Sequence, residues 1–425
     1  MKLKYVFPLL IGLLYFGCNT PKVTELSDYS SYLATTLNTS ELLANAQLWT
    51  NKLQNNPEQF PYLAKRASAY TQIFNATGAV SYLIKAEEDL LHAIDMTNRT
   101  FPSYLKSLAS NYISQHRFKE ALTLLKEAEA NGEKLNGTQK MLFDVYLELG
   151  NDLAAETYLM QIKNESDFDY LIRLAKWSDH NGHLENAIVQ MEKATAIAES
   201  SNLKGIRQWS YTNLADFYGH AGEIEKSYRY YLKALELDPN DAYAKKGIAW
   251  ILYSYENNPD EALRILDHIS SYYKSPDYEL LKADIAEFKN DLALKTEALE
   301  RYKDAVKNKH YGAMYNTYNV LVYTDELVLP KHALEMAQLE VENRPTPQSY
   351  DLLAWSYFKN GDLEMANTII ENYVDGQTSE PDVLYHIAEI YKAAGKTDKV
   401  KELKSELLAS LYELGPTMAP KIKQL

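Results

Sequence analysis

A pattern of small and apolar residues recurs about every thirty-four residues along most of this chain, and it constrains the fold more than any other feature. The clearest copy, LADFYGHAGEIEKSYRYYLKALELDPN, places its key residues at Ala215, Tyr218, Gly222, Ser227, Tyr231 and Ala234. Residues three and four apart share one face of a helix, so this spacing predicts two amphipathic helices joined by a turn at Gly222. Pro239 ends the second helix because proline lacks an amide hydrogen.

The same phase recurs on both sides of this copy, at Ala109, Phe143, Ala175, Ala249, Ala298, Ala333, Ala354 and Ala388. We recognise ten such units, preceded by a helical segment over residues 40–55. One amphipathic helix with alanines is common, but ten in phase are not expected by chance. Stacked repeats stabilise each other through neighbour contacts, which also explains how 425 residues can fold without one large core.

This pattern resembles the tetratricopeptide repeat. The resemblance implies an all-α fold, a right-handed α-solenoid of about ten antiparallel helix pairs, in which the first helices line a concave groove that usually binds extended peptides or partner helices. Ser200, Ser201 and Gly205 indicate a bend between two sub-arrays. We therefore expect N-terminal repeats over residues 40–199, a linker over 200–207, C-terminal repeats over 208–414 and a C-terminal tail over 415–425.

The N-terminus carries the features of an export signal. Lys2 and Lys4 precede an apolar run from Tyr5 to Gly17, which is too short to span a bilayer comfortably. Cys18, the only cysteine in the chain, follows directly. The alternative to a functional role for this cysteine is a cleaved signal with an accidental thiol.

The segment LYFGC resembles a bacterial lipobox, in which the cysteine receives a lipid and becomes the mature N-terminus. The resemblance implies a signal peptide over residues 1–18, lipid attachment at Cys18, and a tether over 19–39. It places the protein in the cell envelope of a Gram-negative bacterium. We expect the outer membrane, because Asn19 stands where some inner-membrane lipoproteins have Asp.

The charge and the motif content exclude several classes of function. The formal net charge is -14, and such a surface repels phosphate backbones, so nucleic-acid binding is not expected. No phosphate-binding loop, HExxH motif or cysteine pair occurs. His180 and His183 flank a turn without a third ligand, which favours ordinary surface histidines over zinc. We therefore predict no catalytic residues, no metal and no cofactor.

The repeat phase predicts which side chains point into the groove, because the residue after the small position in each first helix faces inward. These are Ser110, Asp144, Lys176, Asp216, Trp250, Glu287, Val322, Trp355 and Glu389. With neighbouring positions, the predicted partner-binding set is Trp209, Asn213, Asp216, Tyr243, Lys246, Trp250, Tyr315, Tyr318, Asn319, Asp351, Trp355, Tyr385 and His386. Exposed aromatics in a concave surface commonly anchor a ligand, although any single ring could instead pack between repeats.

These observations predict a non-enzymatic, lipid-anchored scaffold that binds a protein or peptide partner in its groove. The inward series has no Asn at the position where a peptide-carboxylate clamp requires one, which disfavours that partner class. The alternative is a glycan-binding envelope lipoprotein, because proteins of the starch-utilisation type also hold sugars on Trp and Tyr over tetratricopeptide helices. The insertions between repeats are short here, which favours the protein partner. An enzyme would need a catalytic set that the sequence does not contain.

Overall fold

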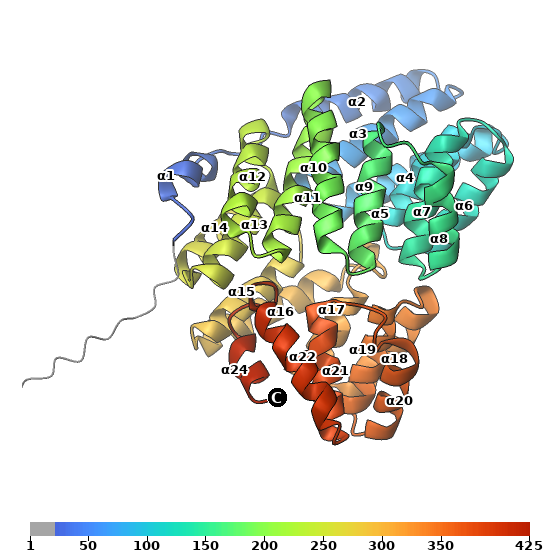
Figure 1. Ribbon diagram of the computed structural model, residues 1–425. Coiled ribbons are helices and arrows are strands. Elements are labelled where there is room, and N and C mark those ends of the chain that lie inside the picture. Colours follow the sequence, from blue (N-terminus) through green and yellow to red (C-terminus); the bar gives the residue numbers. More distant parts are fainter. Residues whose placement is uncertain (1–21) are drawn as a thin grey trace, which may run out of the picture.

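The computed structural model describes residues 22–425 and contains helices but no strands over that range (Figure 1). The predicted signal peptide and Cys18 lie outside the described residues. The first five helix pairs are α3 and α4 (Phe60–Thr77, Val80–Met96), α5 and α6 (Pro102–Ser114, Phe118–Ala130), α7 and α8 (Leu135–Glu148, Asp152–Gln161), α9 and α10 (Phe168–His180, Leu184–Ser201), and α11 and α12 (Lys204–His220, Ile224–Leu237).

The second five pairs are α13 and α14 (Ala242–Trp250, Pro259–Tyr272), α15 and α16 (Asp277–Phe288, Leu292–Val306), α17 and α18 (Asn316–Leu321, Pro330–Asn343), α19 and α20 (Pro347–Lys359, Leu363–Tyr373), and α21 and α22 (Pro381–Ala393, Thr397–Ala409). Helix α2 (Ser40–Asn55) packs before the first pair, and the short helices α23 (Leu411–Leu414) and α24 (Met418–Lys423) follow the last. The predicted all-α solenoid of ten helix pairs is confirmed.

The small residues of the repeat pattern are the points where helices cross most closely. Ala215, Ala234, Ala354 and Ala388 have no exposed surface. A methyl side chain at each crossing lets two helix backbones approach, and larger neighbours such as Tyr218 fill the space around it. The local spacing therefore dictates both the helices and the way in which they pair.

Two of the first helices end in an unusual way. Helix α13 continues into a π-helical turn, η2 (Ile251–Tyr255), and α17 into another, η4 (Val322–Glu326). The turns that follow lack glycine, and Asn257 and Val328 supply the left-handed backbone instead, with φ of 54° and 52°. Isolated π-helical turns are rare in proteins, and those that occur often lie at functional sites. Residues of η4 line the cavity described below, and η2 follows directly after the wall residue Trp250.

The solenoid curls until its second half packs against its first. Figure 1 shows the helices up to α14 as one layer above a second layer that runs from α15 to the C-terminus. The amide of Lys274 donates to the carbonyl of Thr77 at 2.7 Å, and the guanidinium of Arg344 lies 3.1 Å from the carboxylate of Glu148. These contacts join residues that are far apart in the sequence.

At three turn glycines of the first half, the backbone lies very close to the second half. A Cβ added at Gly78 would lie 2.4 Å from the carbonyl oxygen of Lys274, and one at Gly150 would lie 2.7 Å from that of Pro345. At Gly182 it would lie 2.9 Å from Oγ of Ser379. The turns inside first-half repeats therefore contact the loops between second-half repeats.

The residues predicted as a tether fold differently over their described part, because residues 22–35 dock on the middle of the array. The Glu256 carboxylate accepts hydrogen bonds from the amides of Val23 and Thr24 at 2.8 and 2.7 Å. Helix α1 (Leu26–Tyr29) and the 3₁₀ turn η1 (Ser30–Leu33) follow, and Tyr29 is buried against the core. Burial of an aromatic ring and paired backbone amides hold the segment in place.

The predicted linker and tail also differ from what we expected. Helix α10 extends to Ser201 and α11 begins at Lys204, so only two residues separate these helices, one of which is Asn202 in a left-handed cap conformation. The tail contains α24, and Ile422 is fully buried in the core of the last repeats. Among the described helices, none is both long and apolar enough to cross a membrane.

Candidate functional site

A cavity of about 1200 Å³ lies in the interior of the curled array. Its walls come mainly from the first helices of the last six repeats, α11, α13, α15, α17, α19 and α21, together with η4, α23 and α24. Tyr231 of α12 and Lys295 of α16 also contribute. Ligand sites for small molecules usually occupy about 300 to 1000 Å³, so this cavity can hold a ligand of that size or a short chain segment.

The structure places eight of the thirteen predicted groove residues on the cavity wall: Asp216, Tyr243, Lys246, Trp250, Tyr318, Trp355, Tyr385 and His386. The other five are Trp209, Asn213, Tyr315, Asn319 and Asp351. Their part in binding a partner stays a prediction for all thirteen.

The five residues away from the wall have structural contacts of their own. Trp209 packs edge-on against Phe168 on the outer part of α11, and Asn213 donates to the carbonyl of Trp209. Tyr315 is buried, with its ring centroid 5.0 Å from that of Tyr311. Asn319 accepts a hydrogen bond from Tyr302, and Asp351 is buried beneath the wall.

Trp250 links the wall to the C-terminal segment. Its Nε1 donates to the carbonyl oxygen of Tyr412 at 3.1 Å, and Oγ of Ser254 donates to the same oxygen at 2.6 Å. The Tyr412 ring also packs next to Gly219 of α11. The C-terminal segment thus forms one side of the cavity instead of extending away as a tail.

Trp355 is a mostly buried part of the wall, with 4% of its surface exposed. Its ring stacks on His386 at a centroid distance of 4.1 Å, and its Nε1 donates to the carboxylate of Asp325. His386 in turn hydrogen-bonds Asp351 through Nδ1 at 2.7 Å. Burial raises the pKa of Asp351 to about 6, although His386 opposes this shift. This network fixes the orientation of the indole before any ligand arrives.

A second network orients Tyr243 of α13. Its hydroxyl donates to Asp216 at 2.7 Å, and Tyr231 donates to the other oxygen of the same carboxylate. The Tyr231 ring lies against Gly247, where an added Cβ would come within 2.2 Å of it. Burial raises the pKa of Asp216, and the two tyrosine hydroxyls lower it in part. The Tyr243 ring is therefore held at the cavity by its own hydroxyl.

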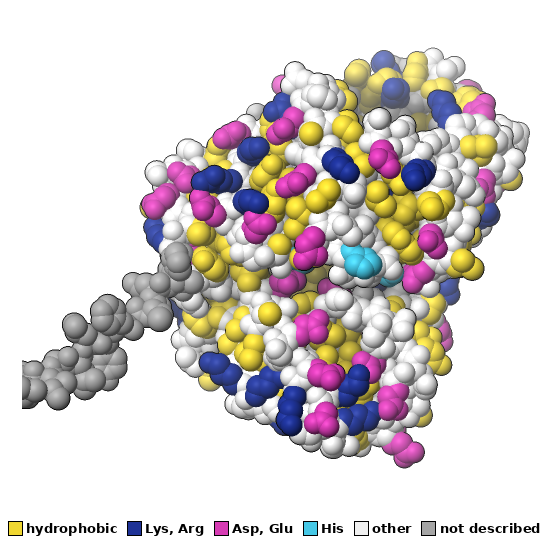
Figure 2. All heavy atoms as spheres, viewed as in Figure 1, with side chains coloured by type: hydrophobic (Ala, Val, Ile, Leu, Met, Phe, Trp, Pro, Cys, Tyr) yellow, Lys and Arg dark blue, Asp and Glu magenta, His cyan; other side chains and the backbone are white. Residues whose placement is uncertain are grey.

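The wall carries an excess of negative charge. Ten carboxylates line the cavity against four lysines. The lysines have acidic partners: Lys246 with Asp277 at 3.0 Å, Lys359 with Asp325 at 2.7 Å, Lys295 with Glu287 at 2.6 Å, and Lys421 with Glu287 at 3.8 Å. Figure 2 shows acidic side chains along the boundary between the two layers on the face in view.

His220 adds a positive charge that is also paired. Its Nδ1 lies 2.9 Å from the carboxylate of Glu413 in α23. Burial lowers the pKa of His220, but the hydrogen bond and charge of Glu413, with Asp179 and Asp216 nearby, outweigh it and raise the pKa to about 9. The imidazolium therefore holds the C-terminal segment to α11.

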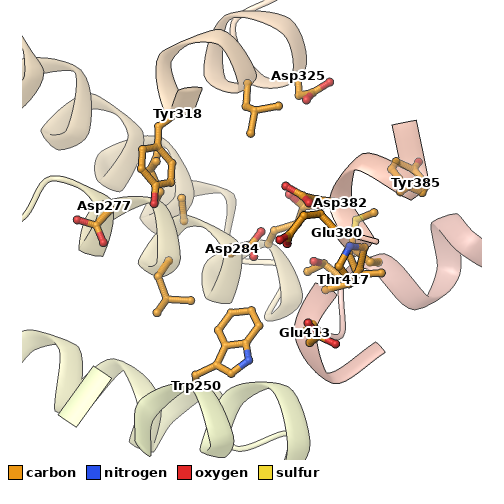
Figure 3. A pocket seen from close by; sticks show the side chains of 18 of the residues that line it. Trp250, Asp277, Asp284, Tyr318, Asp325, Glu380, Asp382, Tyr385, Glu413 and Thr417 are labelled. Atoms are coloured by element: carbon orange, nitrogen blue, oxygen red, sulfur yellow. The ribbon is translucent and has the colours of Figure 1, made fainter. Parts of the chain in front are cut away.

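Four wall carboxylates make no ion pair among the described residues, and of these Asp216 is instead satisfied by the hydroxyls of Tyr231 and Tyr243. The other three are Asp284, Glu380 and Asp382. Figure 3 shows the side chains of Glu380 and Asp382, at the start of α21, projecting toward the same space as Asp284 of α15. Burial and the nearby Glu287 raise the pKa of Asp284 to about 6. Desolvation and the nearby Asp382 raise that of Glu380 to about 7. Burial is the larger cause of both pKa shifts, and the neighbouring carboxylates add to it.

Sequence reasoning missed several residues of the cavity wall for different reasons. Asp284 lies one helical turn before Glu287, which was predicted to face inward, so the spacing could have revealed it. Asp382 lies four residues before His386 and could have been found in the same way. Tyr412, Glu413 and Thr417 come from the C-terminal cap, which has no repeat period to indicate that it returns to the groove.

The described part of the chain has no evident metal-binding site. No group of three or more His, Cys, Asp or Glu side chains within residues 22–425 is arranged to hold a metal ion. The unpaired carboxylates instead offer acceptors for hydrogen-bond donors and for organic cations.

Comparison with known proteins identifies the repeat itself. The tetratricopeptide repeat family model matches residues 210–241, which form most of α11, all of α12 and the turn after it. The resemblance predicted from the sequence is therefore confirmed. No curated protein matches this chain in sequence.

Several solved structures are similar in fold at low sequence identity. A tetratricopeptide repeat protein from Parabacteroides merdae is 16% identical, with 59% of this chain and 94% of that chain covered and a TM-score of 0.39. Yeast Tom70 is 14% identical, with 94% and 95% covered and a TM-score of 0.37. A Rap protein complexed with competence and sporulation factor is 15% identical, with 65% and 89% covered and a TM-score of 0.46.

Proposed function

We propose that this tetratricopeptide repeat protein is a non-enzymatic scaffold of the bacterial cell envelope, which binds a segment of a partner protein in its interior cavity. The observation that carries the proposal is the cavity, which is lined by rings from four of the first helices, α13, α17, α19 and α21: Tyr243 and Trp250, Tyr318, Trp355, and Tyr385. Rigid aromatic side chains contribute large contact area at small entropic cost, which makes them common anchors of protein partners.

The fixed geometry of the wall supports a binding role. Trp250, Trp355 and Tyr243 each have a polar group that is hydrogen-bonded to another part of the wall. A ligand that binds such a surface does not have to order it first, which lowers the cost of association. The cavity is open to a short chain segment, whereas a whole folded domain is larger than it.

The envelope location rests on the lipobox-like sequence before the described region. A lipid at Cys18 would be separated by only a few residues from Lys22, where the chain begins to dock on α12 and α14. The docked segment would then hold the array close to the membrane surface instead of on a long tether. Stable anchoring needs two acyl signals, which a diacylglycerol cysteine supplies.

A glycan is the second candidate, because aromatic rings beside carboxylates also suit sugars. The ring of Tyr318 is partly exposed, and Asp284 and Asp382 could accept hydrogen bonds from hydroxyl groups. Titration of the intrinsic tryptophan fluorescence with oligosaccharides tests this reading. Saturable quenching that is lost in Trp250→Phe would favour the glycan.

Site-specific crosslinking tests the protein partner. We would place the photoreactive amino acid p-benzoylphenylalanine at Tyr318 inside the cavity and, as a matched control, at the exposed Met160 on the outer side of α8. Irradiation of intact cells, followed by mass spectrometry, should yield a protein adduct from position 318 alone. Equal adducts from both positions, or none from position 318, would contradict a partner in the cavity.

The anchor has an independent test. Mass spectrometry of the mature N-terminus should find a lipid-modified Cys18, and Cys18→Ser should move the protein from the membrane fraction to the soluble fraction. An unmodified cysteine would contradict the anchor and leave the cavity proposal intact.

A further inference from the structure

The charge distribution of the cavity constrains the chemistry of the partner segment that can enter it. All four wall lysines form ion pairs within the wall, and His220 is paired with Glu413. Asp284, Glu380 and Asp382 have no such partner within residues 22–425. The charge on this interior surface that has no ion-pair partner is therefore negative.

Helix capping explains only one of these carboxylates. Asp382 lies in the first turn of α21, where the helix dipole favours negative charge. Glu380 is the N-cap residue of α21 but makes no side-chain capping hydrogen bond. Asp284 lies in the last half of α15, where the same dipole disfavours a carboxylate. Asp284 is part of the cavity wall, and Tyr253 donates a hydrogen bond to its backbone carbonyl. Its carboxylate has no hydrogen-bond or ion-pair partner within residues 22–425.

The wall already contains an example of how it holds a cation. The Lys359 ammonium lies 4.5 Å from the centroid of the Trp355 ring and 2.7 Å from the carboxylate of Asp325. An aromatic face and a carboxylate together bind one positive charge here. Trp250 and Tyr318 border the space into which Asp284, Glu380 and Asp382 project, so aromatic rings and carboxylates lie together there as well (Figure 3). Within residues 22–425, no lysine or arginine forms an ion pair with these three carboxylates.

We propose that the cavity selects a basic segment of its protein partner, with arginine or lysine side chains bound between the aromatic rings of Trp250 and Tyr318 and the carboxylates of Asp284, Glu380 and Asp382. This inference rests on the proposed function and names the chemistry of the partner. An acidic segment is rejected, because its carboxylates would meet an interior of the same sign. A neutral sugar would leave the three carboxylates without counter-charge.

The direct test is binding of a fluorescein-labelled Gly-Ser peptide that carries spaced arginines, followed by fluorescence anisotropy on the folded mature protein. The wild-type protein should bind it, and should bind the matched citrulline peptide at least about tenfold more weakly, because citrulline keeps the shape but lacks the charge. The same peptide with glutamate should not bind. Added salt should weaken the arginine peptide most.

Charge-neutral variants locate the site. The triple variant Asp284→Asn, Glu380→Gln, Asp382→Asn should lose roughly tenfold in affinity for each carboxylate that contacts an arginine. The control variant Asp152→Asn, Glu225→Gln, Asp398→Asn removes the same charge from exposed outer positions and should bind as the wild type. Circular dichroism confirms that both variants remain helical. Equal losses in both variants would show a general charge effect and overturn the site.

The outcomes separate this inference from the proposed function. If position 318 still crosslinks a partner equally in the wild type and in the triple variant, a protein partner binds but its basic character is wrong. If the wild type binds the citrulline and arginine peptides equally, the inference is also wrong. If oligosaccharides bind and displace the arginine peptide, and position 318 yields no protein adduct in cells, the proposed protein ligand itself is wrong.

Discussion

Val328 and Asn257 occupy matching positions after the two π-helical turns, and they show how a single residue can be strained by a backbone that its neighbours impose. Val328 has φ of 52°, and its side chain is largely exposed. A β-branched residue in the left-handed region clashes with its own backbone at a cost of about 1 to 2 kcal/mol, which Asn tolerates better.

We therefore expect Val328→Asn to raise the free energy of unfolding by about 1 kcal/mol. Urea denaturation followed by circular dichroism measures this. The control is Val189→Asn, an exposed position inside α10, where Asn has no strain to relieve and where Val and Asn have similar helix propensities. An equal effect of the two substitutions would show that strain at Val328 does not limit stability.

Gly247 packs against the ring of Tyr231, which shares the carboxylate of Asp216 with Tyr243. A substitution at Gly247 therefore tests the packing that positions both tyrosines. An alanine methyl at Gly247 would overlap the Tyr231 ring, so we expect Gly247→Ala to destabilise the protein by about 1 to 3 kcal/mol. Gly205→Ala in α11 is the matched control, because a Cβ there meets no described atom within 4 Å. The control should be neutral or slightly stabilising in thermal denaturation, and a similar loss in both would contradict the overlap.

Among the elements, the docked N-terminal segment depends on one side chain. The Glu256 carboxylate accepts the Val23 and Thr24 amides and, at 3.0 Å, the Thr24 hydroxyl. We expect Glu256→Ala to remove hydrogen-exchange protection from both amides, because a lost partner leaves buried donors unsatisfied at about 1 to 3 kcal/mol. Asp260→Ala, at an exposed carboxylate of α14, is the control. Unchanged protection in Glu256→Ala would contradict the clamp.

The elements also show what the sequence could predict. The ten helix pairs follow from spacings of three and four residues, which are local, and so the pairs were predictable from Ala215, Ala354 and their counterparts. The docking of Tyr29 and the return of Tyr412 depend on contacts between distant residues with no periodic signal. The predicted site was therefore most complete where the repeat phase extends, and lacked the C-terminal cap.

At the scale of the whole molecule, the unpaired charge inside the cavity couples stability to pH. Asp284 faces Glu287, Glu326, Lys295 and Lys421, and Glu380 faces Asp382, Asp179, Glu413 and His220. Both pKa values, about 6 and about 7, are above those of unfolded carboxyl groups near about 4. The folded state binds more protons, so this contribution to stability falls as pH rises from about 4 to 7.

We expect the variant Asp284→Asn, Glu380→Gln to lose part of that pH dependence. The difference in unfolding free energy between the variant and the wild type should be about 1 to 2 kcal/mol more favourable to the variant at pH 8 than at pH 4. Most of this difference should come from Asp284, because solvent screens the more exposed Glu380. Urea denaturation of both proteins at several pH values measures the difference. Parallel pH profiles would contradict the assignment. The affinity of the wild type for the arginine peptide should rise over the same interval, as the carboxyl groups ionise.

Glycines in the seam between the two halves of the molecule have two roles: they allow the halves to pack closely, and they adopt the positive φ of a turn. The two roles can be tested separately. Gly150 and Gly222 both have positive φ, 66° and 74°, so alanine costs a similar amount of backbone strain, about 1 kcal/mol, at either position. Only at Gly150 would the methyl also meet a carbonyl of the other half, that of Pro345, whereas at Gly222 it meets no described atom within 4 Å.

We therefore expect Gly150→Ala to open the seam and Gly222→Ala to leave it closed. Small-angle X-ray scattering should give a larger radius of gyration for Gly150→Ala alone, with faster amide exchange at Arg344 and Thr346. Because the cavity walls come from both layers, Gly150→Ala should also bind the arginine peptide more weakly. Identical scattering and affinity for the two variants would mean that the glycine serves the turn only, and that the seam tolerates displacement without effect on the cavity.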